Sequence, residues 1–267
     1  MNGNNMFSLK EKVAIVTGAA GLIGEEYCNA LASFGANVVL CDLKADPVQA
    51  MARKLADQHG VQCMAVVCDI TSRNDWKKLV RKVSGQFDSI DILVNNAGFT
   101  NKSGLGGYAD GFENFSDDAW NGIMDVNVTG VFLGCQTVGN VMKDQGSGSI
   151  INIASMYGVV SPNHRIYEGT GINQPVAYAV SKAGVIALTK YLATYWGTSG
   201  VRVNAITPGG IFDHHTDPFL ERFKRLNPMG RMGDRQELSG ALVYLASDAS
   251  TYVTGHNLVV DGGWTVW

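Results

Sequence analysis

Residues 13 to 26 read "VAIVTGAAGLIGEE", an apolar run that passes through three glycines into a helix-like pattern. Gly18 directly follows the run, where a tight turn needs backbone freedom that a β-carbon would obstruct. Gly24 would let the following helix pack closely against the strand, and the first amides of that helix would attract a phosphate group. The stretch therefore predicts a strand, a nucleotide-binding turn and a helix. A tight turn that binds nothing is the alternative.

Strand-like and helix-like segments then alternate along the whole chain. The apolar runs are short, rich in β-branched residues and apolar at successive positions, which is typical of strands buried on both faces. Parallel strands need crossover helices, so the alternation predicts an α/β protein with a three-layer, doubly wound parallel sheet, the Rossmann fold. We expect one domain over residues 1 to 267. The strand runs are 13–17, 37–41, 61–67, 91–95, 149–154, 201–206 and 257–261, and the helical segments are 22–34, 46–59, 72–85, 117–143, 176–197 and 235–246.

The composition excludes several classes of protein. The chain has 46% hydrophobic and 17% charged residues and a net charge of -3, so it is neither disordered nor attracted to nucleic acid or anionic membranes. No apolar run approaches the ~20 residues that a membrane span needs, and the N-terminal residues lack the apolar core of a secretion signal. We therefore expect a cytoplasmic protein that acts on a small molecule.

Cysteines and histidines give no sign of a metal site. The five cysteines include no C-x-x-C pair, and most lie inside apolar runs, so we expect them to be reduced and structural. The segment "FDHHTDPF" places His214 and His215 between Asp213 and Asp217. Adjacent histidines suit tetrahedral ligation poorly, and no second cluster supports them. We expect no metal, and a mobile loop that covers the substrate at residues 210–226.

An acidic residue follows the second strand run. Asp42 stands 24 residues after Gly18, about where a carboxylate meets the adenosine ribose in NAD-binding folds. A carboxylate there would repel the extra phosphate of NADP, so NAD is the expected cofactor. A solvated turn aspartate is the alternative reading, and Lys44 could relax the preference.

A tyrosine and a lysine share one helix face. Tyr178 and Lys182 are four residues apart in the amphipathic segment "QPVAYAVSKAGVIALTKYLA". A tyrosine with a pKa of about 10 is a poor base at neutral pH, but a nearby ammonium lowers that pKa. Acid–base work on an alcohol or a carbonyl requires such a shift. The spacing alone is common by chance.

Two connections are longer than simple turns. Residues 98–116 and 156–175 both follow strand ends, where ligands bind in such sheets. We expect both to contact the substrate, with ordinary surface insertions as the alternative.

Nine motifs in order carry a family resemblance. They are "TGAAGLIG", "DL" after the second strand run, "CDIT", "NNAG", "DVNVTG", "INIAS", "YAVSK", "TPGGI" and "VTGHNLVVDGG". Together they resemble the short-chain dehydrogenase/reductase family, in its short single-domain branch, from about Lys12 to Gly263. The resemblance implies hydride transfer between a pyridine nucleotide and a CH–OH group, and a homotetramer or dimer. Trp264 and Trp267 would then pack at a subunit interface.

The resemblance also assigns roles to matching positions. Tyr178 would be the general acid–base, Lys182 would lower its pKa and hold the nicotinamide ribose, and Ser155 would hydrogen-bond the reacting oxygen. Asn127 would anchor a water in the proton relay. The cofactor would lie against Gly18, Gly21, Leu22, Ile23, Gly24, Asp42, Leu43, Asp69, Ile70, Asn96, Ala97, Gly98, Tyr178, Lys182 and the turn Pro208, Gly209, Gly210 and Ile211.

Departures from the family pattern narrow the expected substrate. Ser155 and Tyr178 are 23 residues apart, about ten more than the short branch leads us to expect. The excess is polar and favours a sugar, polyol or sugar-derived substrate. Its polar residues include His164, Arg165, Tyr167, Glu168 and Asn173. The pattern "RIYEGTGINQPVAYAVSK" resembles bacterial members associated with sugar modification, including flagellin-glycan biosynthesis.

The glycine spacing of the opening stretch leaves other functions to weigh. T-G-x-x-G-x-x-G is the loop of the extended branch, whose members include NAD-dependent epimerases and dehydratases, but those chains are usually longer. Leu22 stands where the short branch usually has a glycine, and Gly21 where NADP users often carry a basic residue. The missing cation at Gly21 and the carboxylate of Asp42 agree with NAD. A 3-oxoacyl-type ketoreductase and a non-catalytic nucleotide-sensing protein are further alternatives.

Overall fold

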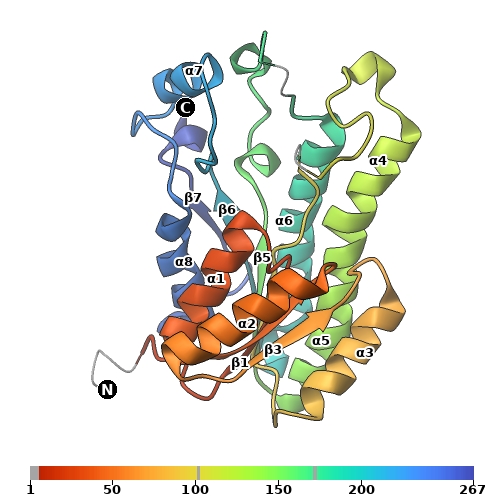
Figure 1. The fold of residues 1–267 in the computed structure, drawn as a ribbon, viewed down its shortest axis with the longest axis vertical. Helices are drawn as coiled ribbons and strands as arrows, with labels where there is room; N and C mark the ends of the chain where they lie inside the picture. The colour runs from red at the N-terminus through yellow and green to blue at the C-terminus, as the bar shows by residue number, and fades with distance from the viewer. Residues whose placement is uncertain (1–5, 101–102, 171–172) are drawn as a thin grey trace.

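Seven strands form one parallel sheet in the order β3-β2-β1-β4-β5-β6-β7, with helices on both faces (Figure 1). The computed structural model describes residues 6–100, 103–170 and 173–267. Residues 101–102 and 171–172, which belong to the two expected substrate loops, lie outside the described residues. The fold is the doubly wound α/β arrangement that the alternating pattern predicts. The strands are β1 (Val13–Thr17), β2 (Asn37–Asp42), β3 (Cys63–Val67), β4 (Ile92–Asn95), β5 (Gly148–Ile153), β6 (Val201–Pro208) and β7 (Asn257–Val260).

The helices fall on the segments expected from the sequence, with bounds that differ by one or two residues in most cases. A separate short helix, α7, follows the cover loop after β6. The α-helices are α1 (Leu22–Ser33), α2 (Ala45–His59), α3 (Arg73–Ser84), α4 (Asp117–Met124), α5 (Val131–Gln145), α6 (Val176–Trp196), α7 (Phe219–Leu226) and α8 (Ser239–Ala246). Shorter turns are η2 (Phe112–Asn114), η3 (Asp125–Gly130), η4 (Met156–Gly158), η5 (His164–Ile166), η6 (Gly197–Ser199), η7 (Arg235–Leu238), η8 (Asp248–Ser250) and η9 (Trp264–Val266).

Both faces of the sheet are covered, which explains why the strand runs are apolar at every position. Along β1, Val13 and Ile15 point into a core built with α3, α5 and α6. Ala14 and Val16 point to the opposite side, into a core built with α1, α2 and α8. Successive side chains of a strand alternate between faces, so each face must be apolar when neither meets water.

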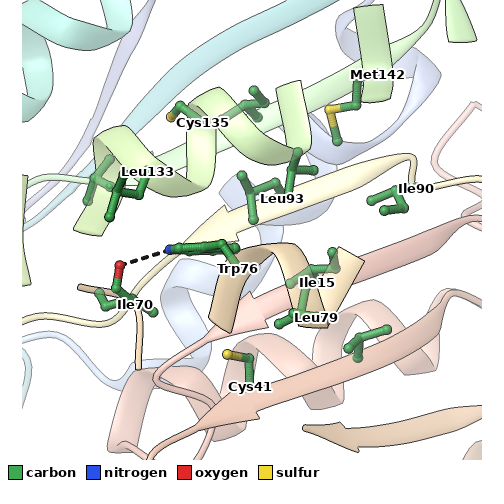
Figure 2. Close-up of a cluster of buried hydrophobic side chains, with 14 of the residues drawn as sticks. Ile15, Cys41, Ile70, Trp76, Leu79, Ile90, Leu93, Leu133, Cys135 and Met142 are labelled. Atoms are coloured by element: carbon green, nitrogen blue, oxygen red, sulfur yellow. Dashed lines mark hydrogen bonds between the residues drawn. The ribbon is translucent and has the colours of Figure 1, made fainter. Parts of the chain in front are cut away.

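The largest fully buried side chain is Trp76 of α3, and it ties one core to the edge of the sheet. Figure 2 shows its ring among side chains from β1, β4 and α5, with Nε1 donating a hydrogen bond to the Ile70 carbonyl at 2.8 Å. A β-carbon at Gly134 of α5 would lie 2.7 Å from the ring, so α5 approaches the indole with bare backbone. The ring therefore fixes the turn that carries Ile70, which follows β3.

One predicted helix is interrupted. The sequence predicts a single helix over residues 117–143, but α4 leads into a π-helical turn, η3, before α5 begins. The chain keeps its direction through the wide turn, so the apolar periodicity of a helix persists and gives no sign of the change. Such wide turns are rare and are frequently found at functional sites. This one contains "DVNVTG", and its Asn127 is fully buried.

One of the two C-terminal tryptophans differs from expectation. The Trp264 ring is not available to a subunit interface, because it is buried in its own chain and stacks on Phe223 with ring centroids 4.5 Å apart. Trp267 is 77% exposed.

None of the helices in the described part of the chain combines the length and the apolarity that a bilayer crossing needs.

Replacing Trp76 by phenylalanine should destabilise the protein by ~2–4 kcal/mol, because the Ile70 carbonyl loses its buried donor and the smaller ring leaves a cavity. Urea unfolding followed by circular dichroism would measure the loss. Trp120→Phe is the matched control, since Trp120 is half-buried. A loss no larger for Trp76→Phe than for the control would contradict this account.

Candidate active site

The ends of β1 and β4 meet where the strand order reverses. The chain runs from β1 outward to β3 and then returns to place β4 on the other side of β1. Ligands bind in the crevice at such a switch point, beyond the carboxyl ends of the strands. Gly18 follows β1 with φ of +62°, and a β-carbon there would lie 2.8 Å from the Cα of Ala97. A β-carbon at Gly24 would lie 2.0 Å from the Gly18 carbonyl oxygen, so α1 packs directly on the turn.

Thr17 joins the two strand ends, and the sequence analysis did not identify it. Its Oγ1 accepts hydrogen bonds from the N–H groups of Asn96 (3.0 Å) and Ala97 (3.1 Å) and donates to the Val94 carbonyl (3.3 Å). The Asn96 amide returns the link by donating to the carbonyls of Thr17 (2.9 Å) and Gly18 (3.2 Å). Asn96 thus braces the glycine turn. The sequence gives a single sign of the role of Thr17, which is its position directly before the first glycine.

The first turn of α1 has no side-chain cap. Gly21 is its N-cap residue, and no side chain accepts a hydrogen bond from the first amides. Leu22 and Ile23 begin the helix, so their N–H groups have no partner within it. Leu22 and Ile23 therefore offer backbone amides at the mouth of the crevice, as the sequence predicts for a phosphate site, whereas the Gly21 N–H donates to the Gly18 carbonyl at 3.1 Å.

Asp42 is held in a fixed orientation at the end of β2. One carboxylate oxygen accepts a hydrogen bond from the Ala20 N–H at 3.0 Å, and the other accepts one from the Leu43 N–H at 2.8 Å. Its carboxylate is half-buried, whereas the Leu43 side chain is 67% exposed. The glycine turn and the expected ribose-binding carboxylate are therefore parts of one hydrogen-bonded unit.

Asp69 and Ile70 follow β3 at the same edge. The Asp69 carboxylate accepts hydrogen bonds from the backbone N–H (2.9 Å) and the hydroxyl (2.7 Å) of Thr71, so part of its capacity is used locally. The Ile70 side chain packs on the wide turn, because a β-carbon at Gly130 would lie 2.6 Å from its Cδ1. Ile70 thus connects the expected adenine site with the segment that carries Asn127.

Both the oxygen and the nitrogen of the Asn127 amide form a hydrogen bond inside the protein. Its Oδ1 accepts a hydrogen bond from the Phe99 N–H at 2.7 Å, and its Nδ2 donates to the Ser181 hydroxyl at 3.1 Å. A β-carbon at Gly98 would lie 3.2 Å from the Asn127 Oδ1 and 3.5 Å from the Lys182 Nζ. Three segments therefore meet at Asn127: the "NNAG" segment at residues 95–98, the wide turn η3 and helix α6.

Ser155, Tyr178 and Lys182 lie together, as the sequence predicts. The Ser155 hydroxyl is hydrogen-bonded to the Tyr178 hydroxyl, and this contact opposes the rise that burial causes in the pKa of Tyr178. The Lys182 Nζ lies 5.7 Å from the centroid of the Tyr178 ring and donates to the Ile153 carbonyl at 2.9 Å. Hydroxyl, phenol and ammonium thus come from the end of β5 and from one face of α6.

The electrostatics differ from the expectation for Tyr178. The sequence analysis expects Lys182 to lower the pKa of Tyr178, but burial raises that pKa above its ordinary value. Burial also lowers the pKa of Lys182 to about 8. Both shifts have one physical cause, because a buried site disfavours whichever form of each group is charged. The phenol is therefore protonated in the protein without ligand.

The turn after β6 closes the crevice on its other side. Pro208 ends β6, and the Gly209 N–H donates to the Val260 carbonyl at 2.9 Å. A β-carbon at Gly210 would lie 2.5 Å from the ring of Phe223 in α7. Ile211 forms a bridge with Gly233, so β7, α7 and the chain before η7 all hold this turn. A hollow of about 430 Å³ is lined by Gly209, Gly210, Ile211, Met229, Arg231, Gly233, Glu237, Leu238, Val260, Asp261 and Gly262.

Three further tyrosines surround Tyr178. Tyr167 belongs to the polar segment that the sequence places beside Tyr178, whereas Tyr108 and Tyr157 were not identified from the sequence. Burial raises the pKa of Tyr108, Tyr157 and Tyr167, and the neighbouring phenol of Tyr178 raises each further. All three remain neutral hydroxyls that both donate and accept hydrogen bonds. The hydroxyls of Tyr157 and Tyr167 contact each other, and the Tyr108 hydroxyl donates to the Gln174 side chain at 3.4 Å.

The histidines of the cover loop form no metal cluster. Within the ranges that the structure describes, no group of three or more histidine, cysteine, aspartate or glutamate side chains has the geometry to hold a metal ion. The His215 ring instead lies 5.2 Å from the Phe219 ring, and its Nδ1 accepts a hydrogen bond from the Asp213 N–H at 3.1 Å. All five cysteines are free thiols.

The known proteins that this chain resembles include several reductases and dehydrogenases. The family model described as enoyl-(acyl carrier protein) reductase matches residues 18–265. A sorbose reductase from Candida albicans is 38% identical, over 98% of this chain and 89% of its own, and a D-threitol dehydrogenase from Mycolicibacterium smegmatis is 36% identical, over 97% and 95%. A short-chain type dehydrogenase/reductase from Mycobacterium marinum superposes with a TM-score of 0.86 at 34% identity over 97% of both chains. A gluconate 5-dehydrogenase from Burkholderia cenocepacia, in complex with NADP and tartrate, has a TM-score of 0.89 at 30% identity over 100% of both.

Lys182 should make the stability of the ligand-free protein depend on pH. Its folded pKa of about 8 lies below the ordinary value of 10.5, so between these values the unfolded chain binds more protons and stability rises with pH. Lys182→Met removes this contribution. The free energy of unfolding of the variant minus that of the wild type should therefore fall by on the order of 3 kcal/mol between about pH 7 and 10.5.

Urea unfolding at a series of pH values would measure this difference. Lys190→Met is the control, because Lys190 lies on the same helix and is exposed. A difference that stays constant with pH for Lys182→Met would refute the burial effect.

Proposed function

Because this chain belongs to the short-chain dehydrogenase/reductase family, it is an oxidoreductase that interconverts an alcohol and a ketone, and we propose that its substrate is a polyol, a sugar or a sugar-derived molecule. The observation that carries the proposal is the group of buried tyrosine hydroxyls around Tyr178. Tyr108, Tyr157 and Tyr167 bring donors and acceptors to a site where an acyl chain or a steroid would need apolar walls. The named activities of the sorbose and threitol relatives agree with this choice.

The crevice fits a pyridine nucleotide. The uncapped amides of Leu22 and Ile23 would hold the pyrophosphate, and the Asp42 carboxylate would accept the adenosine ribose hydroxyls. Asp69 and Ile70 would flank the adenine. The rest of the surface in contact with the cofactor would come from the other residues that the sequence predicts. These are Gly18, Gly21, Gly24, Leu43, Asn96, Ala97, Gly98, Tyr178, Lys182, Pro208, Gly209, Gly210 and Ile211.

NAD is the preferred form of the cofactor in this proposal. The Asp42 carboxylate is fixed by two backbone N–H groups, so it cannot turn away from a phosphate placed on the ribose. A second negative charge at hydrogen-bond distance would be repelled. Gly21, at the start of α1, supplies no cation to offset that repulsion.

Asp42→Asn should therefore reduce the preference for NAD. We expect the ratio of kcat/KM for NAD to that for NADP to exceed about ten in the wild type and to fall about tenfold or more in the variant. Asp46→Asn is the control, since Asp46 is an exposed carboxylate in the first turn of α2. A wild-type enzyme that prefers NADP would contradict the proposed role of Asp42.

The proton transfer follows from the arrangement around Tyr178. A bound pyridine nucleotide would supply the hydride acceptor or donor for the carbinol carbon. The Tyr178 phenolate would take the proton of the substrate hydroxyl, and the Ser155 hydroxyl would hold the same oxygen in place. The Lys182 ammonium would stabilise the phenolate from 5.7 Å. Asn127 would set the position of α6 through Ser181 and anchor a water in the relay.

Tyr178→Phe should lower kcat by about 10² to 10⁴-fold, the usual share of a general acid–base, while the Kd for NAD changes less than about threefold. Steady-state kinetics and NAD titration by calorimetry would measure the two effects. Tyr191→Phe, an exposed tyrosine of the same helix, is the control. Turnover that survives in Tyr178→Phe would show that another group moves the proton.

A substrate screen separates this proposal from its alternatives. Polyols, ketoses and sugar acids would be assayed with NAD, beside a 3-oxoacyl thioester and a nucleotide-sugar. Oxidation of a polyol or reduction of a ketose is the expected result. Activity on the thioester alone would indicate a ketoreductase, isomerisation or dehydration of the nucleotide-sugar would indicate the epimerase or dehydratase class, and NAD binding without turnover would indicate a sensor.

We also propose a homo-oligomer, a tetramer or a dimer, in the cytoplasm. Tyr191 and Tyr195 of α6 and Phe132 of α5 are exposed by 64%, 66% and 41%, which supports a contact between subunits along these helices. The free thiols agree with a reducing compartment.

A further inference from the structure

Helix α7 holds the segment that lies between Ser155 and Tyr178. Figure 1 shows α7 beside this segment, at the end of the molecule where the strands finish. One nitrogen of the Arg222 guanidinium, Nη1, donates to three carbonyls, those of Arg165 at 3.4 Å, Ile166 at 3.5 Å and Glu168. The Arg165 and Ile166 carbonyls lie in the turn η5, and the Glu168 carbonyl follows it. The cation therefore meets three backbone carbonyl oxygens in and after this turn.

The turn η5 also has stabilising contacts other than those with Arg222. Asn163 begins it, and the Asn163 Oδ1 accepts a hydrogen bond from the Arg165 N–H at 3.2 Å. Ile166 in the turn is buried with 2% exposure. The segment is thus a folded element with a capped start and a cation at its end.

An aromatic contact joins the same two segments. Tyr167 follows η5, and its ring stacks on Phe219 at the start of α7, with centroids 5.4 Å apart and an angle of 29° between the planes. Both rings are buried. The stack lies one turn from Arg222 along α7, so α7 contacts the segment through both an apolar and a charged group.

The contacts continue to the reacting groups. The Tyr167 hydroxyl contacts the Tyr157 hydroxyl, and the Tyr157 N–H donates to the Ser155 Oγ at 3.2 Å. The Ser155 hydroxyl is hydrogen-bonded to Tyr178. An unbroken series of contacts therefore runs from the surface of α7 to the proposed acid–base.

We propose that Arg222 is a positioning residue that clasps the segment 163–168 to α7 and keeps the cover over the substrate site formed before substrate arrives. The sequence predicted a mobile cover at residues 210–226, whereas these contacts tie its helix to a second folded segment. A preformed cover spares the substrate the cost of ordering it, and that cost would otherwise appear as weaker apparent binding. The proposal rests on the proposed function only in naming the site that the cover serves.

Hydrogen–deuterium exchange on the ligand-free protein tests the clasp directly. In Arg222→Ala, amide exchange should accelerate about tenfold in two separate segments, residues 163–170 and α7, because each loses the partner that orders it. Arg222→Lys should restore slow exchange in both, since a single nitrogen makes all three contacts and an ammonium can replace it. Arg225→Ala, an exposed arginine one turn along the same helix, should change neither.

Kinetics give a second readout, with the polyol or ketose that the screen identifies. Arg222→Ala should raise KM for that substrate about tenfold while kcat stays within about threefold, because the saturated site reorders the cover. The Kd for NAD should be unchanged. Arg222→Lys should return KM to within about threefold of the wild type.

Each outcome decides the proposal. Faster exchange in both segments, with recovery in Arg222→Lys, supports the clasp. Faster exchange confined to α7, unchanged exchange, or an equal effect of Arg225→Ala overturns it. If no polyol or sugar is turned over, the proposed function fails, but the exchange experiment still decides whether Arg222 orders the cover.

Discussion

The whole site depends on how closely the backbone after β1 approaches the backbone after β4. Gly18 adopts a left-handed conformation, and a β-carbon at this position would lie 2.8 Å from the Cα of Ala97. Gly24 lets α1 pack directly on the Gly18 carbonyl. The side chains of Thr17 and Asn96 then join the two strand ends by hydrogen bonds. With the turn fixed, the uncapped start of α1 faces the crevice and Asp42 reaches the Ala20 N–H. A larger side chain at either glycine would displace the crevice, the helix and the carboxylate together.

Burial sets the chemistry of the site as much as its shape. Tyr178 and Lys182 both sit where charge is disfavoured, so the pKa of the phenol is raised and that of the ammonium is lowered. Burial therefore disfavours the phenolate–ammonium pair that proton transfer requires. Further positive charge or hydrogen bonds to the phenolate would favour that pair. The neutral tyrosines around them add hydrogen-bonding capacity without adding charge. This is the environment expected of a site that recognises hydroxyl groups.

The sequence predicts the parts of the site that follow strand ends, because the carboxyl ends of parallel strands meet at one edge of a sheet. Gly18 and Asp42 are such residues, the helical spacing adds the pair Tyr178 and Lys182, and the family motifs add Asn96, Ser155 and Asn127. The polar segment that carries Tyr167 was expected beside Tyr178. Tyr108, Tyr157 and Arg222 were missed, since their roles arise from contacts between distant segments that no local period records. The wide turn at Asp125–Gly130 was missed for another reason, because it continues the direction of the helices on both sides. The direction of the Tyr178 pKa shift was missed because spacing along a helix says nothing of burial.

The strand order has a consequence for the way the chain is made. β1 pairs with β2 on one side, but its other edge stays open until β4 is available, and the paired residues Val16 and Val94 are about 80 residues apart. At a synthesis rate of ~5–20 residues per second, that edge waits for several seconds on the ribosome. Its first four residues are apolar, and an open apolar edge is a template for pairing with other chains. The strand that leads into the glycine turn therefore needs protection in the nascent chain until β4 is made.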